Sequence, residues 1–230
     1  MAFTTEHCGL HVHIGLPTPP DLKPGTPPPT FSLATLQHLA YLSVIYEKAI
    51  STLHPPHRRE HSPASLIDLQ TNLDNFIDEP TYDLSDWNDD ADIPTTPITD
   101  EEAPPISFAK ARAKIFSPDM TIPLLASLMG GKTKGHIVNW SYVARTNGLA
   151  RTLEFRQHAG ELRGEEVRWW VGFCVGLVRL AEERGRELGN CLKEWRGGEG
   201  YKWEEWGEEI CVEDLLGEMG MEGRGRERRW

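Results

Sequence analysis

An acidic, proline-rich segment in the middle of the chain limits what the remaining residues can fold into. Between Glu60 and Ala109 there are 13 acidic residues and no Lys or Arg, and proline recurs there without any apolar period. Such a segment cannot bury enough apolar surface to offset the conformational entropy that it would lose on ordering. We therefore expect residues 62–105 to be a disordered insert, with an acidic interaction motif as the alternative.

The chain has four segments of different character, of which the insert is one. We expect residues 1–61 to form the first part of one domain and residues 106–186 its second part. Residues 187–230 are rich in Gly, Glu, Arg and Trp, and we expect a loosely ordered tail. The formal net charge of −11 belongs to this acidic segment, because the chain outside Glu60–Ala109 has 24 basic and 22 acidic side chains. The folded part is therefore expected to have no basic field that would attract nucleic acid.

Composition and segment lengths also exclude several classes of protein. The chain has no run of about 18 apolar residues, which a membrane-spanning helix would need. Its first residues have neither the basic nor the apolar region of a secretory signal. The four cysteines are widely spaced and contain no C-x-x-C pair. We predict a cytoplasmic protein with reduced thiols and with no membrane or nucleic-acid partner.

Apolar residues at helical spacing predict two long helices and one short one. Ser32 is a good N-cap for the first helix, which is expected to end before Pro55. The second is expected from Glu165 to Arg184, and the short one near Val212–Glu218. The predicted buried stripe of the first helix is Leu33, Leu36, Leu39, Leu42, Tyr46, Ala49, Ile50 and Leu53. That of the second is Val167, Trp170, Val171, Cys174, Leu177, Val178 and Ala181.

The segment GLHVHIGL, Gly9–Leu16, has the alternation of a half-buried strand. Its aliphatic residues would face inward, and His11 and His13 would face outward between two glycines. Solvent exposure is the simplest interpretation of such a face. The alternative is a pair of metal or phosphate ligands, since the imidazoles would stand about 6–7 Å apart on one side of the strand. Gly9 and Gly15 would then leave room for a bulky ligand.

The segment RTLEFRQH, Arg151–His158, has the same alternation. Leu153 and Phe155 are expected to face inward, while the outward residues are expected to be Thr152, Glu154, Arg156 and His158. An ordinary cross-strand salt bridge would explain a Glu-x-Arg pattern. A second ionisable strand face in the same short domain strengthens the functional interpretation of both.

Several weaker candidates accompany these strands. Arg58 and Arg59, which follow the first helix, are either solvated or ligands of a phosphate or carboxylate. The run GGKTKG lacks the spacing of a phosphate-binding loop and is interpreted as a turn. The remaining functional alternative for this turn is that Lys132 or Lys134 faces a ligand. Asn139, in HIVNWSYVA, is expected on a hairpin strand adjacent to the strand of Arg151–His158.

The other histidines carry less weight. A zinc site of His7, Cys8 and His11 would lack a fourth ligand at plausible spacing. The remaining histidines are interpreted as helix-surface or loop residues, and they are His38, His54, His57, His61 and His136.

Taken together, CGLHVHIG, LHPPHRR, VNWSYV and TLEFRQHAGEL, followed by a Trp-rich helix, resemble the amidoligase family. Its members are carboxylate–amine ligases of the glutamine synthetase and glutamate–cysteine ligase superfamily. The order and spacing of these motifs agree with the family from about Thr4 to Ala181, apart from the insert.

The resemblance implies an α+β fold, a curved antiparallel sheet with helices packed on one face. It also implies ATP and Mg²⁺ as cofactors, and a small-molecule or peptide carboxylate and an amine as substrates. By motif position, His11 and Glu154 would be metal ligands, and Arg156 would hold the phosphoryl group or the carboxylate. His13 would contact metal or nucleotide phosphate, and Arg58 is the further candidate for nucleotide binding.

The sequence also departs from the family pattern. Family members have an earlier strand of the type G-[VI]-E-[FIL]-E, which supplies further carboxylates, whereas this chain begins seven residues before Cys8. We therefore expect the glutamine synthetase-like fold to be incomplete at its N-terminus. Glu161 stands where the family commonly has Thr, and its charge would weaken phosphate binding.

Three functions follow from these observations. The first is an ATP- and Mg²⁺-dependent carboxylate–amine ligase, in a truncated chain. The second is a catalytically inactive remnant of such a domain, which pairs with another chain through an open sheet edge. The third disregards the resemblance and retains only the two ionisable strand faces, as a metal-dependent hydrolase.

Overall fold

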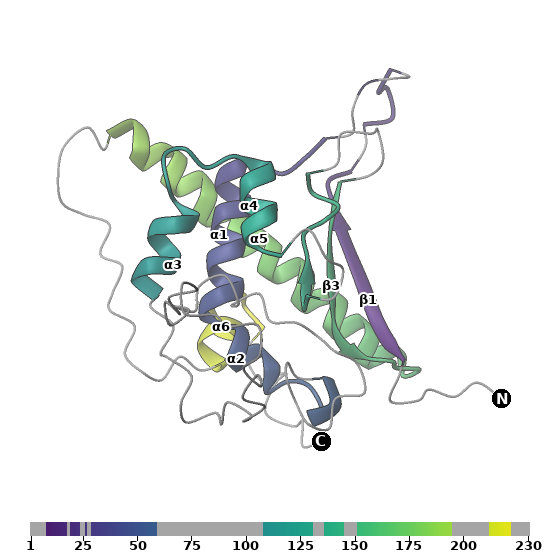
Figure 1. Cartoon of the computed structure of the whole chain (residues 1–230). Helices are drawn as coiled ribbons and strands as arrows, with labels where there is room; N and C mark the ends of the chain where they lie inside the picture. The colour runs from purple at the N-terminus through teal and green to yellow at the C-terminus, as the bar shows by residue number, and fades with distance from the viewer. Residues whose placement is uncertain are drawn as a thin grey trace, which may run out of the picture.

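The fold combines helices with a small antiparallel sheet (Figure 1). The computed structural model describes residues 8–17, 19–23, 26, 29–58, 108–130, 136–144, 151–194 and 212–221. Within these residues the sheet has three strands in the order β1-β3-β2, namely β1 (Gly9–Gly15), β3 (Thr152–Ala159) and β2 (Val138–Asn139). The predicted mixture of helices and an antiparallel sheet is confirmed, as are both predicted strands.

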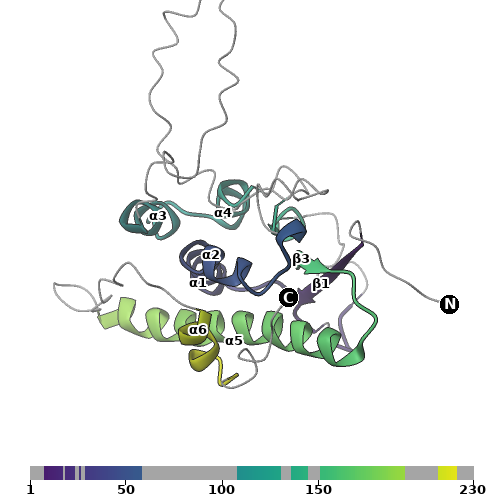
Figure 2. The same cartoon turned by 90° about the horizontal axis from the view of Figure 1, so that it is seen from below.

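The helices surround α1 rather than lying in one row. Figure 2 shows α1 between α5 on one side and the pair α3 and α4 on the other, and all three helices contact it. The bounds are α1 (Leu33–Ile45), α2 (Glu47–Ser51), the 3-10 helix η1 (Pro56–Arg58), α3 (Phe108–Ile115), α4 (Ile122–Leu128), α5 (Gly164–Glu194) and α6 (Val212–Glu218). The part of the domain that precedes the acidic insert in the sequence therefore packs against the part that follows it.

The first predicted helix is divided into two. Ser32 is the N-cap, as predicted, and its Oγ accepts a hydrogen bond from the backbone N–H of Thr35. At Tyr46 the backbone leaves the helical region, with φ −101° and ψ 2°, and α2 begins at the next residue. Helix α1 is buried on nearly all sides, because α5, α3 and α4 cover it together. A helix in such a position is apolar around its whole circumference rather than along one stripe.

Helix α5 begins within one residue of its predicted start but continues to Glu194, ten residues beyond the predicted end at Arg184. Most of the predicted face is buried, but Val171 is exposed. Trp169 and Phe173 are buried in addition, and they extend the row of aromatic rings at the sheet end of α5.

The helices α5 and α1 approach each other closely at one glycine. A Cβ atom at Gly185 would lie 2.9 Å from the backbone N of Thr35 and 3.1 Å from the carbonyl carbon of Ala34. Because those two atoms belong to the main chain of α1, no side-chain rotation would relieve the contact. The missing side chain at Gly185 therefore fixes how near α5 lies to the first turn of α1.

Some predicted features lie outside the described residues. These are the insert 62–105, His7, Arg59, His61, Lys132, Lys134 and the Trp-rich stretch of the tail. The short helix predicted within the tail is confirmed as α6, which buries Val212, Leu215 and Leu216. This part of the tail therefore packs on the domain, against the expectation of loose order. Among the residues that the structure describes, no helix has both the length and the apolar character needed to cross a membrane.

Candidate functional site

The two ionisable strands pair directly in the sheet. His13 lies opposite Glu154, and Gly15 lies opposite Thr152. Residues opposite each other in an antiparallel pair point to the same side of the sheet. Val12 and Phe155, the next pair along, are both buried against the helices. The outward faces predicted for the two strands thus form one shared face of the sheet, which extends along β3 as far as Arg156.

A β-bulge interrupts this alternation. Arg156 and Gln157 of β3 together lie opposite the single residue His11, because Val12 pairs with Phe155 and Leu10 pairs with His158. Bulges of this kind place two consecutive residues outside the ordinary alternation of a strand. Arg156 points outward, whereas Gln157 and the residue after it are both buried.

The prediction that His158 shares the outer face with Glu154 is therefore wrong. His158 is buried on the helix side, with its ring centroid 5.2 Å from that of Trp170 and 5.6 Å from that of His54. The physical reason is the extra residue of the bulge, which turns the strand face by one position. The alternating pattern of the sequence carries no sign of this residue.

Glu154 is the centre of the outer face. Its Oε1 accepts a hydrogen bond from Nη1 of Arg156 at 2.8 Å and lies 2.9 Å from Nδ1 of His11. Its Oε2 accepts from Nδ2 of Asn139 at 2.7 Å, and Nε2 of His13 lies 3.6 Å from Oε1. Only 3 % of Glu154 is exposed. Three strands therefore bring four polar side chains to one buried carboxylate.

Asn139 is held in place as firmly as the carboxylate that it binds. It lies on β2, which is adjacent to β3 as predicted, and it lies opposite Glu154 in the pairing of these strands. Its Oδ1 accepts a hydrogen bond from the backbone N–H of Ser141 at 2.9 Å, which directs the amide nitrogen toward Glu154. Asn139 was predicted next to β3, but its role as a partner of the carboxylate was not. The pairing register that places it opposite Glu154 exists only between the two strands, so no local pattern in the sequence indicates this role.

Arg58 reaches the same region from the helix layer. It ends η1, and its Nε donates to the backbone carbonyl of Gln157 at 3.1 Å, while its Nη2 donates to the carbonyl of Arg156. The residue is 1 % exposed, and burial, together with the neighbouring charge of Arg156, lowers the pKa of Arg58. The bulge thus supplies the two carbonyl oxygens that hold a buried cation beneath the outer face.

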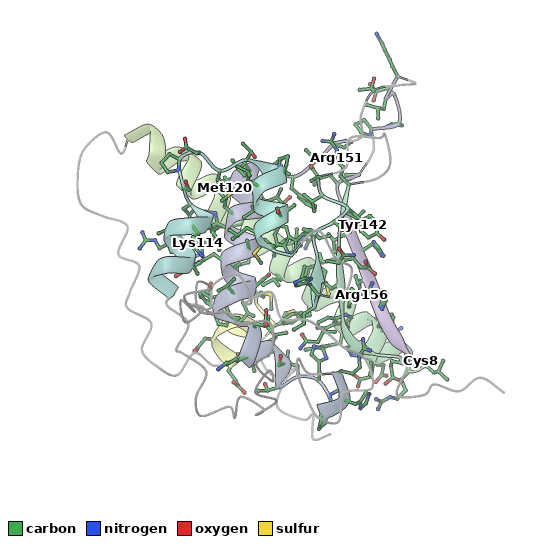
Figure 3. The ribbon with its side chains drawn as sticks, in the orientation of Figure 1. Cys8, Lys114, Met120, Tyr142, Arg151 and Arg156 are labelled. Carbon is green, nitrogen blue, oxygen red and sulfur yellow. The ribbon has the colours of Figure 1, made fainter. Side chains whose placement is uncertain are left out.

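All five predicted site residues, His11, His13, Arg58, Glu154 and Arg156, lie in one region of the sheet. Figure 3 shows Arg156 along this sheet, with Tyr142 toward one end and Cys8 at the other. His13 is held toward the Tyr142 end, where its Nδ1 lies 3.2 Å from Oγ1 of Thr152 and its ring centroid lies 5.7 Å from that of Tyr142.

The two glycines of β1 make room for the protein's own side chains. A Cβ atom at Gly9 would lie 2.8 Å from Nη2 of Arg58 and 3.1 Å from Nε2 of His11. A Cβ atom at Gly15 would lie 3.0 Å from Cγ2 of Thr152. The prediction that these glycines clear space for a bulky ligand is therefore wrong, because Arg58, His11 and Thr152 fill that space.

The electrostatics of the face favour a neutral His11. Burial, followed by the charge of Arg156, lowers the pKa of His11 from the ordinary value of 6.5, although the nearby Glu154 carboxylate acts in the opposite direction. A protonated His11 would place a further cation beside Arg156 and Arg58. The face as folded therefore has the two arginine charges and a single carboxylate, that of Glu154.

As arranged, these residues do not form a magnesium site on their own. Mg²⁺ prefers carboxylate oxygens and demands near-octahedral geometry. Glu154 is the single carboxylate of the cluster, and Arg156 and His11 already engage its Oε1. Within the described part of the chain, no group of three or more His, Cys, Asp or Glu side chains has an arrangement that would hold a metal ion.

Glu161, which was expected to disturb phosphate binding, is engaged locally. Its carboxylate accepts hydrogen bonds from the backbone N–H groups of Leu162 and Arg163, and from the Arg163 guanidinium at 2.6 Å. These contacts, with the Arg163 side chain as the largest cause, lower the pKa of Glu161 to about 2. Its charge therefore stabilises the loop that leads into α5.

Three of the histidines interpreted as surface or loop residues are buried, which corrects that prediction. His38 is 4 % exposed within α1 and bonds the carbonyl of Ala34, because α1 is covered on nearly every side. His54 packs edge-on against Trp170, and His136 is buried beneath Gly130. At Gly130 φ is +79°, and a Cβ atom would overlap the His136 ring, which confirms a turn at the first glycine of GGKTKG.

No family model matches the chain, and neither a curated protein nor a solved structure is significantly similar to it. The resemblance to the amidoligase family therefore stays a prediction, which rests on the four sequence motifs and the Trp-rich helix that follows them.

Proposed function

We propose that this chain contributes residues to the active site of an ATP- and Mg²⁺-dependent carboxylate–amine ligase with a glutamine synthetase-like curved sheet. The observation that supports the proposal is the convergence of Arg156, His11 and His13 on Glu154 at the outer face of the sheet. The buried Arg58 lies beneath them, on the backbone carbonyl of Arg156. The cytoplasmic location stays part of the same proposal.

The reaction that we propose has two steps. An oxygen of the substrate carboxylate attacks the γ-phosphorus of ATP, and ADP leaves. The nitrogen of the amine then attacks the acyl carbon, and inorganic phosphate and a proton are released. Both steps develop negative charge on phosphoryl and carboxyl oxygens, so an enzyme accelerates them mainly by positioning cations against those oxygens.

The exposures of the site residues match the roles that we propose for them. The Arg156 side chain is 22 % exposed and donates through Nη1 to Glu154, which leaves part of its guanidinium facing outward for a phosphoryl or carboxylate oxygen. The His13 side chain is 46 % exposed and is the residue that we expect at the nucleotide phosphates. Arg58 is buried, and it contributes positive potential from beneath without contacting the ligand.

Nucleotide binding and acyl phosphate formation test the proposal in sequence. We expect the full chain to bind ATP in the presence of Mg²⁺ by calorimetry. We also expect ATP-dependent hydroxamate when hydroxylamine traps the acyl phosphates formed from a mixture of amino-acid and dipeptide carboxylates. His13→Gln should weaken nucleotide binding about tenfold, which corresponds to about 1.4 kcal/mol for a lost phosphate contact.

A matched variant keeps this test specific. Arg179 is exposed on α5, far along the helix from the sheet. Arg179→Gln should therefore form hydroxamate at the wild-type rate, whereas Arg156→Gln should lose hydroxamate formation. Equal behaviour of the two variants would contradict the role of Arg156. Tight binding of Zn²⁺ without any affinity for nucleotide would favour the hydrolase instead.

One observation favours a second candidate, a catalytically inactive remnant of such a domain. Arg156, His11 and Asn139 already engage the Glu154 carboxylate, so both of its oxygens have partners without a ligand. In addition, β1 is an edge strand among the described residues, and an uncovered edge can accept a strand of another chain. A folded protein that binds neither Mg²⁺-ATP nor Zn²⁺ would support this second candidate.

A further inference from the structure

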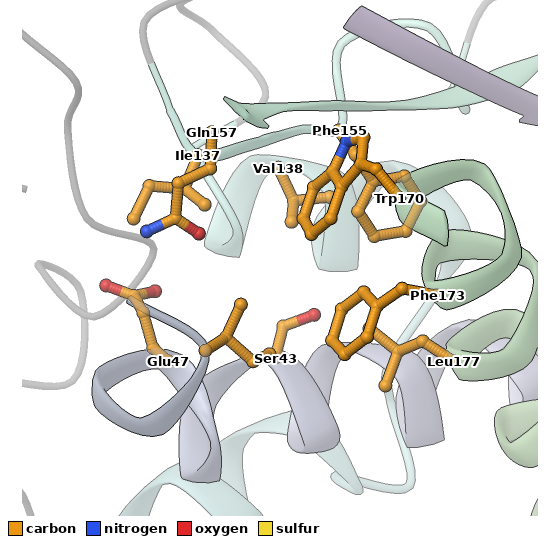
Figure 4. Close-up of a pocket in the computed structure, with 10 residues that line it drawn as sticks. Ser43, Glu47, Ile137, Val138, Phe155, Gln157, Trp170, Phe173 and Leu177 are labelled. Atoms are coloured by element: carbon orange, nitrogen blue, oxygen red, sulfur yellow. The ribbon is translucent and has the colours of Figure 1, made fainter. Parts of the chain in front are cut away.

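A small cavity lies between the inner face of the sheet and the helices (Figure 4). Its apolar wall includes Phe155 of β3 together with Trp170, Phe173 and Leu177 of α5. The centre of a water-sized sphere can occupy about 20 Å³ of it. A cavity needs at least about 10–15 Å³ of such volume, together with polar partners, to hold a water molecule. The space is therefore large enough for one water molecule.

Two buried polar atoms face this cavity from opposite walls. Ser43 of α1 and Gln157 of β3 are 4 % and 1 % exposed, and both line the cavity. Figure 4 shows the Ser43 hydroxyl and the Gln157 amide oxygen directed into the space between them. Neither the Ser43 Oγ nor the Gln157 Oε1 has a hydrogen-bond partner in the part of the chain that the structure describes.

We propose that this cavity binds one buried water molecule that joins Ser43 to Gln157. The water donates one hydrogen bond to Oε1 of Gln157 and shares a second with the hydroxyl of Ser43, which can donate or accept. The carboxylate of Glu47 lines the same cavity and offers a third polar contact. Internal waters typically make two to four such contacts, and a site without them stays dry.

The proposed water would also support the outer face of the sheet. Gln157 is one of the two residues of the bulge, and its amide nitrogen donates to Oγ of Ser51 at 2.8 Å. Its backbone carbonyl accepts the hydrogen bond from Nε of Arg58. A water on Oε1 completes the anchoring of this side chain in the core, and thereby fixes the carbonyl that holds Arg58. This inference does not depend on the proposed function.

The wild-type chain tests the proposal directly. We expect a crystal structure to place one spherical density peak in the cavity, within hydrogen-bond distance of both Ser43 Oγ and Gln157 Oε1. An empty cavity would overturn the proposal. Direct contact between the two side chains, or density for a larger molecule, would overturn it as well.

Solution measurements with matched variants provide a second test. Magnetic relaxation dispersion of the water signal counts waters that stay in a protein for longer than nanoseconds. We expect Ser43→Val, which removes the hydroxyl and fills the space, to lower that count by one water relative to the wild type. Ser127→Val, at an exposed position of α4, should leave it unchanged. The same count in both variants, each shown to be folded by circular dichroism, would overturn the proposal.

Discussion

Arg156 and Glu154 lie two residues apart on the outer face of β3, and Nη1 of the arginine donates to Oε1 of the glutamate at 2.8 Å. The glutamate is almost fully buried, whereas the arginine side chain retains 22 % of its exposure. The pair is therefore asymmetric. The carboxylate is enclosed by its partners, and the guanidinium is anchored at one nitrogen while part of it faces outward.

Replacing Glu154 with alanine should lower the free energy of unfolding by about 2 kcal/mol, because hydrogen-bond donors of Arg156 and Asn139 would lose their acceptor. Urea unfolding measures the change. Glu183→Ala, at an exposed position of α5, should cost less than about 0.5 kcal/mol. Similar values for the two variants would show that the cluster contributes little to stability.

The lowered pKa of His11 should appear in the pH dependence of stability. The unfolded chain takes up the proton first as the pH falls below the ordinary value of 6.5, so the free energy of unfolding should decrease from there toward the lower pKa of the folded state. His11→Gln should remove this part of the decrease. Urea unfolding of both proteins between about pH 7.5 and pH 5 measures it. Parallel curves would contradict the assignment.

Gly9→Ala should destabilise the protein by about 1–2 kcal/mol, because the new methyl group would overlap the Arg58 guanidinium. Two backbone carbonyls hold that guanidinium, so it cannot move away freely. Thermal unfolding measures the change. A Cβ at Gly172 would meet nothing within 4 Å, so Gly172→Ala should stabilise α5 by about 0.5–1 kcal/mol. Stabilisation by both substitutions would contradict the close contact at Gly9.

Gly185→Ala should destabilise the protein by about 2 kcal/mol, although alanine favours helix more than glycine does. The added carbon would meet main-chain atoms of Thr35 and Ala34, which forces α5 and α1 apart. Chemical denaturation measures the effect, again with Gly172→Ala as the control. A gain in stability at Gly185 would mean that the two helices are farther apart than the structure places them.

Glu161 should titrate near pH 2 in the folded protein, well below the ordinary value of 4.5. A depressed carboxyl pKa contributes stability above the unfolded value, and this contribution is lost as the pH falls from 4.5 toward 2. The carboxyl carbon shift in an NMR titration measures the pKa. In Arg163→Gln the pKa should return toward 4.5, and an unchanged value would show that the Arg163 side chain is not the main cause of the shift.

Local patterns in the sequence predicted those parts of the fold that depend on near neighbours. The N-cap at Ser32 and the acidic first turn of α5 are interactions within a few residues. The alternation of β1 is equally local, and it placed His11 and His13 on the outer face correctly. The five candidate site residues were predicted because each belongs to such a pattern or to a motif close to one.

The errors arise where tertiary packing decides. His158 and Gln157 are buried together because the strand has one residue more than its partner, and that difference exists only between two strands. The burial of His38 likewise depends on helices that come from distant parts of the chain and cover α1. No window of local sequence contains that information.

The bulge also has a consequence for insertions and deletions in this strand. Deleting Gln157 would return β3 to uniform alternation, with His158 and the residues after it still on their present faces. Strand β3 could still pair with β1 if it were one residue shorter. The deletion would, however, remove the hydrogen bond from the Gln157 side chain to Ser51 and the backbone carbonyl that accepts from Nε of Arg58. The length of this strand is therefore determined by the buried arginine rather than by strand pairing.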